Sequence, residues 1–378
     1  MPQANFALFE FDLQLNQLSN NKKLSEGLSA VVLIGDEVWT ANDETIALER
    51  LSCKNSNAGA NKTYCQHAHF PLDKYLALPG GVQGEIDIEG LDYRDGYLWL
   101  IGSHSLSRKK AKKNDAVEEN LKRLSEISKP EEIRNRYLLA RIPLVEKDGN
   151  RVPEKQTQQN GITKTAAHLR LEDNGNQLTA MLAQDDHLKP FFAIPSKDNG
   201  FDIEGLAVTD DGRVFVGLRG PVLRGWAIIL ELRPEGENNS SVFELKDVDG
   251  NAANTTLCRK HFFELGGLGI RDLYIDGTDL LILAGPTMDL DGPVSIFRWK
   301  EGVKKTGVSF VSANNNNDEL KKIIDIPYGS GEDHAEGMTS FSTVAGKTNS
   351  LMIVYDLAAK ARQTAPANLI ADIFELAI

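Results

Sequence analysis

The sequence predicts an all-β protein, most specifically a β-propeller. A strand-like run that ends in a small acidic turn and restarts as an apolar run occurs five times along the 378 residues. In four copies the turn reads Glu-Gly followed by an apolar residue, and in the fifth it reads Arg-Asp-Leu. These copies are Glu26-Gly27-Leu28, Glu89-Gly90-Leu91, Glu204-Gly205-Leu206, Arg271-Asp272-Leu273 and Glu336-Gly337-Met338.

The spacing of the copies is the second observation. Their last residues are 63, 115, 67 and 65 positions apart. Periods above about 40 residues with several short strands per unit are typical of propeller blades, because a single blade cannot bury both of its faces.

Each unit reads as four antiparallel strands, one before the acidic motif and three after it. Turns such as Asp-Asp-Gly and Asp-Gly separate apolar runs after the motif, which is a hairpin signal. In chain order these runs include VVLIGDEVWTA and IALERL, DYRDGYLWLIGS and RYLLARIPL, AVTDDGRVFVGL and WAIILEL, and YIDGTDLLILAG and VSIFRWK.

The last unit has one strand too few. It offers MTSFSTV, SLMIVYD at 350–356 and NLIADIFELA at 368–377. The N-terminal run FALFEFDL at 6–13 fills the vacancy, which joins both ends of the chain in one blade and removes an open sheet edge. We therefore predict a single domain over 1–378 with five four-stranded blades.

The long second interval predicts insertions in blade two, at 105–135 and 145–190. Val117, Leu121, Leu124 and Ile127 keep a helical spacing amid dense charge, and the segment 176–191 has leucines at similar intervals. Both are interpreted as helical. The alternative is a sixth blade, in which TAAHLRL and QLTAML form a hairpin across Asn174-Gly175-Asn176.

Composition limits the partners. The net charge is −12 and the pI about 5.2, which argues against nucleic acid as the main partner and favours a cation or a soluble metabolite.

Three cysteines without a Cys-x-x-Cys pair exclude a thiolate metal cluster. No apolar run approaches 18 residues, so no membrane span is expected. The N-terminus lacks signal architecture, so a cytoplasmic protein is expected, or a periplasmic or secreted one if a leader has been removed.

The acidic motifs and the loops after the second strands are expected at one mouth of the channel, because adjacent antiparallel strands run in opposite directions. Carboxylates gathered there raise one another's pKa unless a positive charge compensates. One interpretation is a Ca²⁺ or Mg²⁺ ion. A second is pairing with arginines of the same loops, and a third is an architectural role in which each acid binds backbone N–H groups. The predicted metal ligands are Glu26, Glu89, Glu204, Asp272 and Glu336.

Departures from the repeat are the candidates for chemistry. Arg219 and Arg271 are predicted to clamp an anionic substrate, and His104 to move a proton near neutral pH. Arg224, Asp289 and His334 lie in the same set of loops and are predicted to bind substrate. The sequence contains no Gly-x-Ser-x-Gly elbow, no Walker loop and no His-Glu-x-x-His helix, so three common enzyme classes lack support.

The segments DIEGLAVTDDGRVFVGLRGPVLRGWA, SKDNGFDIEGL and LAGPTMDLDGP resemble the signatures of a bacterial domain family of unknown function that carries the same Glu-Gly-Leu repeat. More distantly the chain is similar to propellers named for the esterase-like activity of phytase, and to gluconolactonase or regucalcin-like propellers. The latter place a Glu-Gly acid near a divalent metal. That resemblance implies a metal role for Glu26, Glu89, Glu204 and Glu336 only.

Two hypotheses of function follow. The first is a metal-assisted hydrolase, a phosphoesterase or lactonase, that acts on a small anionic molecule and needs no organic cofactor. The second is a non-catalytic propeller whose channel mouth binds a ligand and whose insertions contact a protein partner. The sequence does not decide between them, and it leaves the oligomeric state open.

Overall fold

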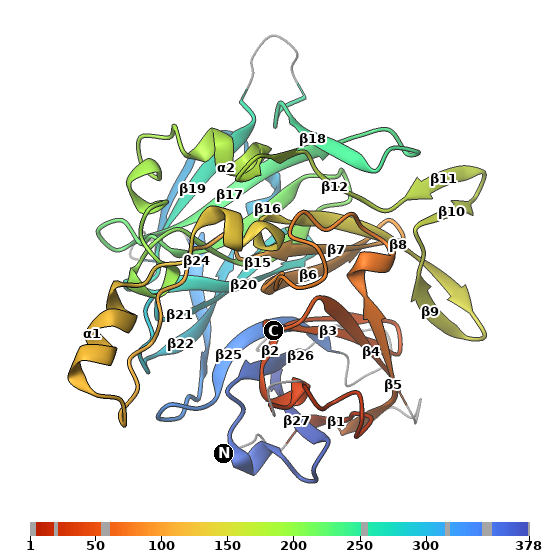
Figure 1. Ribbon diagram of the computed structural model, residues 1–378. Helices are drawn as coiled ribbons and strands as arrows, with labels where there is room; N and C mark the ends of the chain where they lie inside the picture. The colour runs from red at the N-terminus through yellow and green to blue at the C-terminus, as the bar shows by residue number, and fades with distance from the viewer. Residues whose placement is uncertain are drawn as a thin grey trace.

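Antiparallel pairing groups twenty strands into five units of four (Figure 1). The computed structural model describes residues 5–18, 22–53, 61–250, 256–313, 318–341 and 350–376. From the innermost strand outward, the units are β2 (Leu28–Ile34), β3 (Glu37–Asn42), β4 (Ala47–Cys53) and β5 (Lys62–Pro71); β6 (Ile88–Arg94), β7 (Tyr97–Gly102), β8 (Leu139–Lys147) and β12 (Ala167–Leu169); β15 (Asp202–Val208), β16 (Val214–Gly220), β17 (Trp226–Glu235) and β19 (Cys258–Glu264); β20 (Gly269–Asp276), β21 (Asp279–Gly285), β22 (Val294–Trp299) and β24 (Leu320–Ile326); and β25 (His334–Phe341), β26 (Ser350–Asp356), β27 (Asn368–Glu375) and β1 (Phe6–Glu10).

The inner strands form a closed ring. β2 contacts β6, β6 contacts β15, β15 contacts β20, β20 contacts β25, and β25 returns to β2. The N-terminal strand β1 completes the last unit by antiparallel pairing with β27, and on its other side it pairs in parallel with β5. The predicted all-β propeller is confirmed, and the N-terminal run closes the ring as the sequence indicates.

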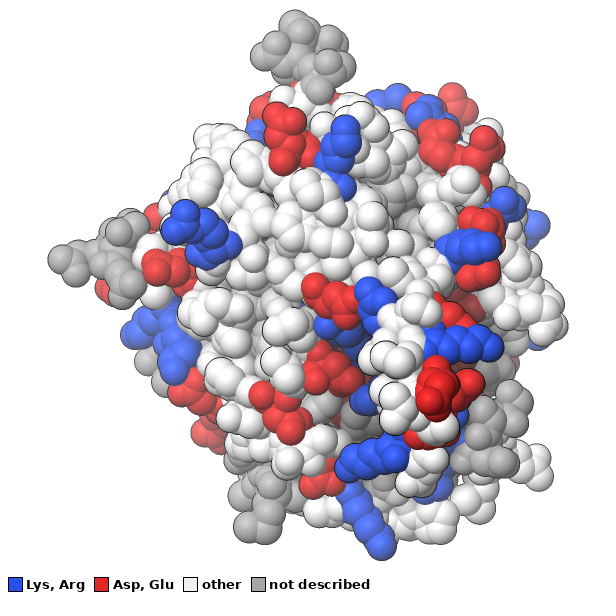
Figure 2. Space-filling model, turned by 60° about the vertical axis from the view of Figure 1, so that its left-hand side comes forward, with Lys and Arg blue, Asp and Glu red and all other residues white. Residues whose placement is uncertain are grey.

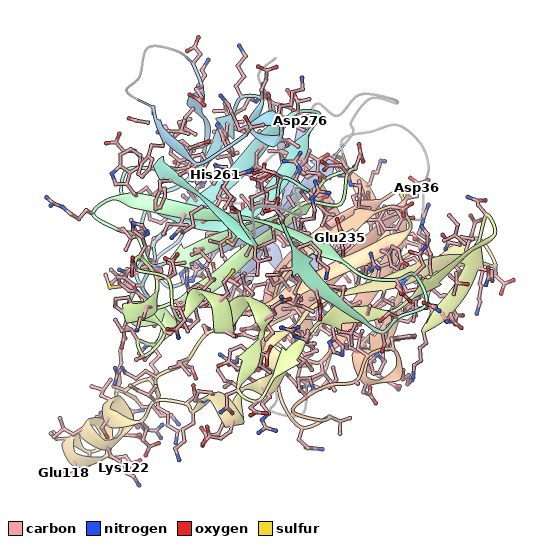
Figure 3. The ribbon with its side chains drawn as sticks, turned by 90° about the horizontal axis from the view of Figure 1, so that it is seen from above. Asp36, Glu118, Lys122, Glu235, His261 and Asp276 are labelled. Carbon is pink, nitrogen blue, oxygen red and sulfur yellow. The ribbon has the colours of Figure 1, made fainter. Side chains whose placement is uncertain are left out.

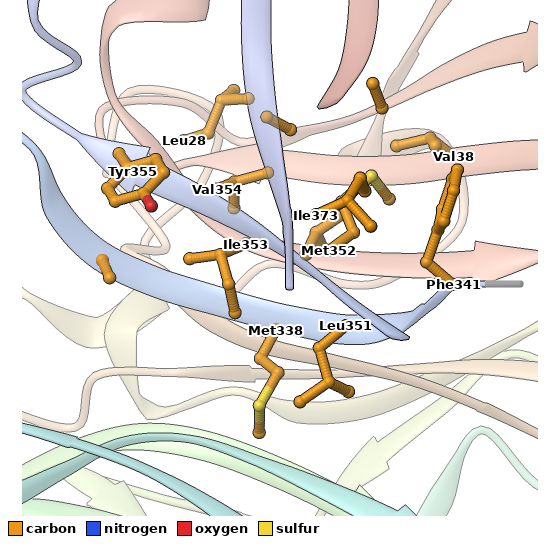
Figure 4. Close-up of a cluster of buried hydrophobic side chains, with 14 of the residues drawn as sticks. Leu28, Val38, Met338, Phe341, Leu351, Met352, Ile353, Val354, Tyr355 and Ile373 are labelled. Carbon is orange, nitrogen blue, oxygen red and sulfur yellow. The ribbon is translucent and has the colours of Figure 1, made fainter. Parts of the chain in front are cut away.

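Adjacent units bury their apolar side chains against one another. The largest cluster lies between the fifth and first units and includes Leu28, Val38, Phe341 and Ile353, all fully or almost fully buried (Figure 4). The same cluster extends between the fourth and fifth units, and three further clusters fill the three remaining interfaces. Period-2 alternation along each strand places these residues on opposite faces of the sheets, so every blade has two apolar faces.

The first insertion is helical, but its apolar face is not buried. Helix α1 (Val117–Ser125) has the predicted spacing, yet Val117 is 70% and Leu121 64% exposed. The helix projects from the body of the molecule, with Glu118 and Lys122 on it labelled in Figure 3. The prediction of a helix is therefore right for this segment, whereas packing of the helix on a blade is not observed.

The second insertion differs from its prediction, because several short strands rather than helices make up much of its regular structure. These are β9 (Asn150–Pro153), β10 (Gln156–Gln159), β11 (Ile162–Thr165), β13 (Leu171–Glu172) and β14 (Gly175–Asn176). Only α2 (Gln177–Leu182) is an α-helix there, and it begins at Asn176, whose side chain accepts a hydrogen bond from the Thr179 N–H. The hairpin required by the six-blade alternative is absent, since 177–182 is this helix and β12 is an outer strand of the second unit.

Two more strands join neighbouring units at the periphery. β18 (Val242–Lys246) pairs with the end of β17 and, in parallel, with β12. β23 (Ser309–Ser312) pairs in parallel with β19. No helix in the described ranges is both long and apolar enough to cross a membrane.

The acidic motif has a structural origin, since the pairing of each inner strand with its neighbour is irregular at or near this point. The register shifts between Ile88 and Gly90, between Ile203 and Leu206, between Ile270 and Asp272, and between Ala335 and Gly337. In the first unit the shift lies between Leu28 and Ala30. A bulge of this kind re-aims one side chain toward the channel without ending the strand.

The glycine after the bulge allows close approach of the next blade. A Cβ atom on Gly90 would lie 2.7 Å from Leu206 Cβ and 3.0 Å from its backbone nitrogen, whereas one on Gly205 would lie 3.2 Å from Asp272 Cα. We expect Gly90→Ala to lower the free energy of unfolding by about 1–3 kcal/mol through overpacking. Gly205→Ala should lower the free energy of unfolding by a smaller amount. Urea denaturation of both variants tests this, and equal losses would contradict it.

Candidate functional site

The five bulges define equivalent positions around the channel. The residues at the bulges are Ser29, Glu89, Glu204, Arg271 and Glu336. On each second strand, the equivalent position is the residue that follows the partner of the residue just before the bulge. These residues are Asp43, Ser103, Arg219, Gly285 and Asp356. These ten positions hold five carboxyl groups and two guanidinium groups.

Glu26 does not belong to this set, which corrects the predicted ring. It lies three residues before the bulge, in a 3₁₀ turn at Leu24–Glu26, and its side chain is 38% exposed and pairs with Lys23 at 2.9 Å. Ser29 occupies the equivalent position and donates a hydrogen bond to the Ile88 carbonyl at 2.5 Å. The Glu-Gly-Leu sequence of the first unit therefore lies three residues before the position that this motif has in the other units.

Asp272 has the architectural role that was one of the three interpretations. Its buried carboxylate accepts hydrogen bonds from the N–H groups of Leu273 at 2.8 Å and Met338 at 2.7 Å, so it links β20 to β25. Asp92 repeats the arrangement, because it accepts from Tyr93 and from Val208 in the next unit. Burial raises the pKa of Asp92 to about 6, although these N–H groups oppose the shift.

Arg219 and Arg271 are bound to carboxylates of the channel. Arg219 contacts Asp202 at 2.5 Å and Glu204 at 2.6 Å. Arg271 contacts the other oxygen of Glu204 at 3.0 Å and Glu336 at 2.9 Å. Both arginines are only 6% exposed. The arginine that interrupts the repeat thus connects the third, fourth and fifth units through charge-assisted hydrogen bonds.

A polar cavity of about 410 Å³ opens above this network. Glu89, Glu204 and Glu336 line its floor with Asp43 and Asp356, while Arg108, Lys109, Lys110 and Lys197 come from segments around its rim. On the face turned forward in Figure 2, basic and acidic side chains lie interspersed rather than in blocks of one sign. The cavity therefore combines an acidic floor with basic residues near its mouth.

Three floor carboxyl groups have no cationic partner within ion-pair distance among the described residues. They are Asp43, Glu89 and Asp356. Burial, reinforced by Asp356 and Asp87, raises the pKa of Asp43 to about 8. Burial and then Asp87 raise the pKa of Glu89 well above its usual value, and burial raises that of Asp356. Each of these acids is held near others in a site where ionisation is costly.

Arg136 is the third arginine of the site. It contacts Asp87 at 3.0 Å and Glu85 at 3.1 Å. Burial lowers its pKa, but Asp87 and Glu85 outweigh this and raise it overall. Arg136 thus compensates an acid of the second unit as Arg219 does in the third. In the described ranges, no arginine of this kind lies at the junction of the first and fifth units.

His104 lies outside the cavity, in a buried structural position. Its Nδ1 lies 2.7 Å from the Gly102 carbonyl oxygen, its Nε2 lies 2.8 Å from Asn176 Nδ2, and its ring packs edge-on against Tyr137. Burial lowers the pKa of His104 to about 4. With both ring nitrogens engaged and only 2% of the residue exposed, this geometry does not support the predicted role of a general base.

The predicted substrate-binding residues are dispersed. Asp289 lines the cavity rim, where it pairs with Lys110 of the first insertion at 2.7 Å. His334 borders a separate small hollow and lies 3.4 Å from Asp291. Arg224 is exposed in a turn with φ of 49° and does not line the cavity. The structure therefore brings only Asp289 of these three to the cavity.

The residues predicted as metal ligands do not assemble into one ligand set. Glu26 lies apart, Asp272 is bound to backbone N–H groups, and both oxygens of Glu204 are held by arginines. Within the described ranges, no three His, Cys, Asp or Glu side chains are arranged to hold a metal ion. Pairing with arginines, the second interpretation, describes Glu204 and Glu336, whereas Glu89 is left without a partner.

Sequence reasoning did not select Asp43, Asp356 and Arg136 as site residues. Asp43 and Asp356 end the second strands of the first and last units, so the strand pattern could have found them if each hairpin register had been extended past its bulge. Arg136 follows the first insertion by sequence, and only the folded ring places it beside Asp87. No local motif signals that contact.

The raised pKa of Asp43 makes a testable prediction. An acid whose pKa is higher in the folded than in the unfolded state destabilises the fold on ionising, so its contribution falls as pH rises from 3.8 through about 8. We expect Asp43→Asn to remove this decline, so that its free energy of unfolding exceeds that of the wild type by on the order of 5 kcal/mol at pH 8 and is nearly equal to it at pH 4. Urea denaturation across this range measures it. Asp148→Asn, in an exposed turn, is the control, and a parallel pH profile for Asp43→Asn would contradict the prediction.

Solved structures similar to this chain share little sequence with it. A PQQ-bound aldose sugar dehydrogenase from Streptomyces coelicolor aligns over 100% of both chains with a TM-score of 0.37 and 10% identity. A family-43 β-1,3-galactosidase with galactodeoxynojirimycin aligns over 96% of this chain and 93% of its own, with a TM-score of 0.38 and 9% identity. A Bacteroides ovatus family-43 protein of a xyloglucan locus aligns over 97% and 54%, with a TM-score of 0.39 and 9% identity. No curated protein matches the chain in sequence.

One family model matches residues 27–372, which include the inner strands of all five units and every residue of the cavity floor. The match confirms the resemblance to a family without an assigned reaction. The chain therefore belongs to DUF3616, a family of proteins of unknown function.

Proposed function

We propose that this protein binds a small, positively charged ligand in the cavity, with the cationic group held by Asp43, Glu89 and Asp356. The observation that carries the proposal is that these three floor carboxyls have no cationic partner among the described residues, while the nearby arginines are bound to other acids. An ammonium or guanidinium group would stabilise their ionised forms and satisfy their oxygens.

The distribution of charge disfavours the small anionic substrate expected from the sequence. Arg219 and Arg271 would have served as its clamp, but each already contacts two carboxylates. An anion would have to displace these contacts and would then face the uncompensated acids of the floor. A cation would instead meet three carboxyl groups that have no cationic partner among the described residues, although Asp356 also accepts a hydrogen bond from the Leu357 N–H at 2.7 Å.

Thermal melts test the proposal, since a ligand that binds only the folded state raises the melting temperature. The probes are methylammonium, guanidinium, Ca²⁺ and Mg²⁺, each titrated at constant ionic strength. We expect a saturable rise with at least one probe in the wild type and in the control Glu118→Gln on the projecting helix. The rise should vanish in the double variant Asp43→Asn/Asp356→Asn. No rise with any probe, or a rise that the double variant retains, would overturn the proposal.

A second candidate function is acid–base hydrolysis by the floor carboxyls. It is favoured by Asp43, whose pKa of about 8 leaves it protonated at neutral pH in a cavity that also holds carboxyl groups paired with arginines. Such a pair of unlike acids supplies a proton donor and a proton acceptor. A screen of phosphoesters, lactones and glycosides should reveal turnover that Asp43→Asn abolishes and Glu118→Gln retains. Turnover that survives Asp43→Asn would exclude this role for Asp43.

A further inference from the structure

The rim of the cavity carries the opposite charge to its uncompensated floor. Basic side chains reach it from two segments, the first insertion at 107–111 and the turn at 196–198 that precedes β15. Arg108 pairs with Asp198 at 2.7 Å, Lys110 with Asp289 at 2.7 Å, and Lys109 with Glu126. These pairs fix the insertion across the mouth, so the rim is an ordered wall built from separate units.

Lys197 differs from the other rim cations. It lines the cavity and is exposed, and no ion pair or hydrogen bond joins it to another residue of the described ranges. Its positive charge opposes the rise that burial causes in the pKa of Asp43 and Asp356, and it adds to the lowering of the pKa of Asp289 by Lys110, as expected of an ammonium group near both floor and rim. The cavity thus presents an unpaired cation above unpaired acids.

Glu89 is the complementary group on the floor. It is recessed at the bulge of β6, where backbone pairing fixes its direction, and neither a hydrogen bond nor an ion pair joins it to another described residue. Its neighbours in equivalent positions, Glu204 and Glu336, both contact Arg271. Floor and rim therefore each offer an ionisable side chain with no ion-pair or hydrogen-bond partner among the described residues, Glu89 on the floor and Lys197 at the rim.

On this basis, and resting on the proposed function, we infer that the ligand is a small zwitterion of the amino-acid class, with its ammonium group on the floor carboxyls and its carboxylate at Lys197. A simple amine would place a second positive charge near Lys197 and give that lysine no partner. A simple carboxylate would give the floor acids no cationic partner. Leu124 and Ala111 are the apolar residues among those lining the cavity, so a short, polar ligand fits better than a long aliphatic one. A volume of about 410 Å³ is within the range of small-molecule sites.

Three probes of similar length distinguish the contributions of the two charges. 4-Aminobutyrate carries both, butylamine carries only the positive charge, and butyrate carries only the negative charge. Isothermal titration calorimetry at pH 7 should show 4-aminobutyrate binding about two- to fivefold more tightly than butylamine, the size of one additional ion pair to an exposed side chain, and butyrate not binding. In Lys197→Gln, 4-aminobutyrate should lose this advantage while butylamine binds at least as well as before. Lys113→Gln, an exposed charge change in the first insertion that does not line the cavity, is the control and should leave all three affinities unchanged.

The outcomes distinguish this inference from the proposed function. If butylamine binds and loses affinity in Asp43→Asn/Asp356→Asn, but 4-aminobutyrate binds no more tightly, the cation site stands and the zwitterion inference fails. The inference would also be overturned if 4-aminobutyrate still bound more tightly than butylamine to the Lys197→Gln variant. If no probe binds, or butyrate alone does, both proposals fail. Because Lys197 is exposed, its replacement should leave the melting temperature unchanged, so a loss of affinity reports on the ligand contact.

Discussion

Arg271→Ala is expected to lower the free energy of unfolding by about 3–5 kcal/mol, the cost of removing one partner from a buried ion pair. The substitution would leave Glu336 without its ion-pair partner and Glu204 with Arg219 alone, in a region that excludes most water. It would also remove the hydrogen bond to the Pro286 carbonyl at 3.0 Å. Chemical denaturation at pH 7 measures the loss, and Arg224→Ala, an exposed arginine of a neighbouring loop, should change stability by less than about 0.5 kcal/mol.

Replacing Arg271 by glutamate instead of alanine tests whether the charge of this residue is what stabilises the ring. Arg271→Glu would restore the Glu of the repeat, and from sequence similarity between units alone it should be tolerated. The structure predicts the opposite, because a third carboxylate would stand between Glu204 and Glu336 with only Arg219, on Glu204, left as a counter-charge. We expect Arg271→Glu to be less stable than Arg271→Ala above pH 6 and to recover partly at lower pH, where the acids protonate. Wild-type stability for Arg271→Glu would show that the arginine does not compensate the ring.

Arg362→Ala is expected to have a comparable effect, again about 3–5 kcal/mol. Arg362 is 1% exposed, contacts Asp333 at 2.7 Å and Asp372 at 2.8 Å, and lies 3.8 Å from the centre of the Tyr355 ring. The alanine variant would leave both aspartates buried without this guanidinium and would remove a cation–π contact. Tyr355→Phe should cost less, about 1 kcal/mol, since it deletes only the hydrogen bond from its hydroxyl to Asp372.

Lys360→Ala is the matched control for Arg362, because Lys360 is exposed in the same 3₁₀ turn at Lys360–Arg362. Its stability should stay within about 0.5 kcal/mol of the wild type. If Arg362→Ala were no less stable than Lys360→Ala, the buried network would not contribute as described. Urea denaturation monitored by tryptophan fluorescence serves all three variants.

The sequence predicted the strands well because their signals are local. Apolar runs separated by Asp-Gly turns fix a hairpin regardless of what lies further along the chain, and the missing strand at the end predicted the role of Phe6–Glu10. The segment 145–190 was less predictable. Its short strands pair with each other and with unit two, and leucines at helical spacing describe only α2 within it.

The site was predicted in part, for a physical reason. The channel mouth and the residues Glu89, Glu204, Arg219 and Arg271 follow from alternation and strand direction. Which acid meets which arginine depends on the bulge register and on ring closure, and neither is encoded in a short motif. Glu26 shows the consequence, because it shares the letters of the repeat while Ser29 shares the position.

The pairing of β1 with β27 has a consequence for how the ring is made. Phe6 is paired with Asp372, so β1 cannot complete its sheet until the chain has been synthesised as far as β27. Contacts so distant in sequence form slowly because a long loop must close first. Until then, parallel pairing with β5 is available to β1 within the first unit and would shield an otherwise open edge during synthesis. The strand that closes the propeller is thus also placed to protect the growing chain.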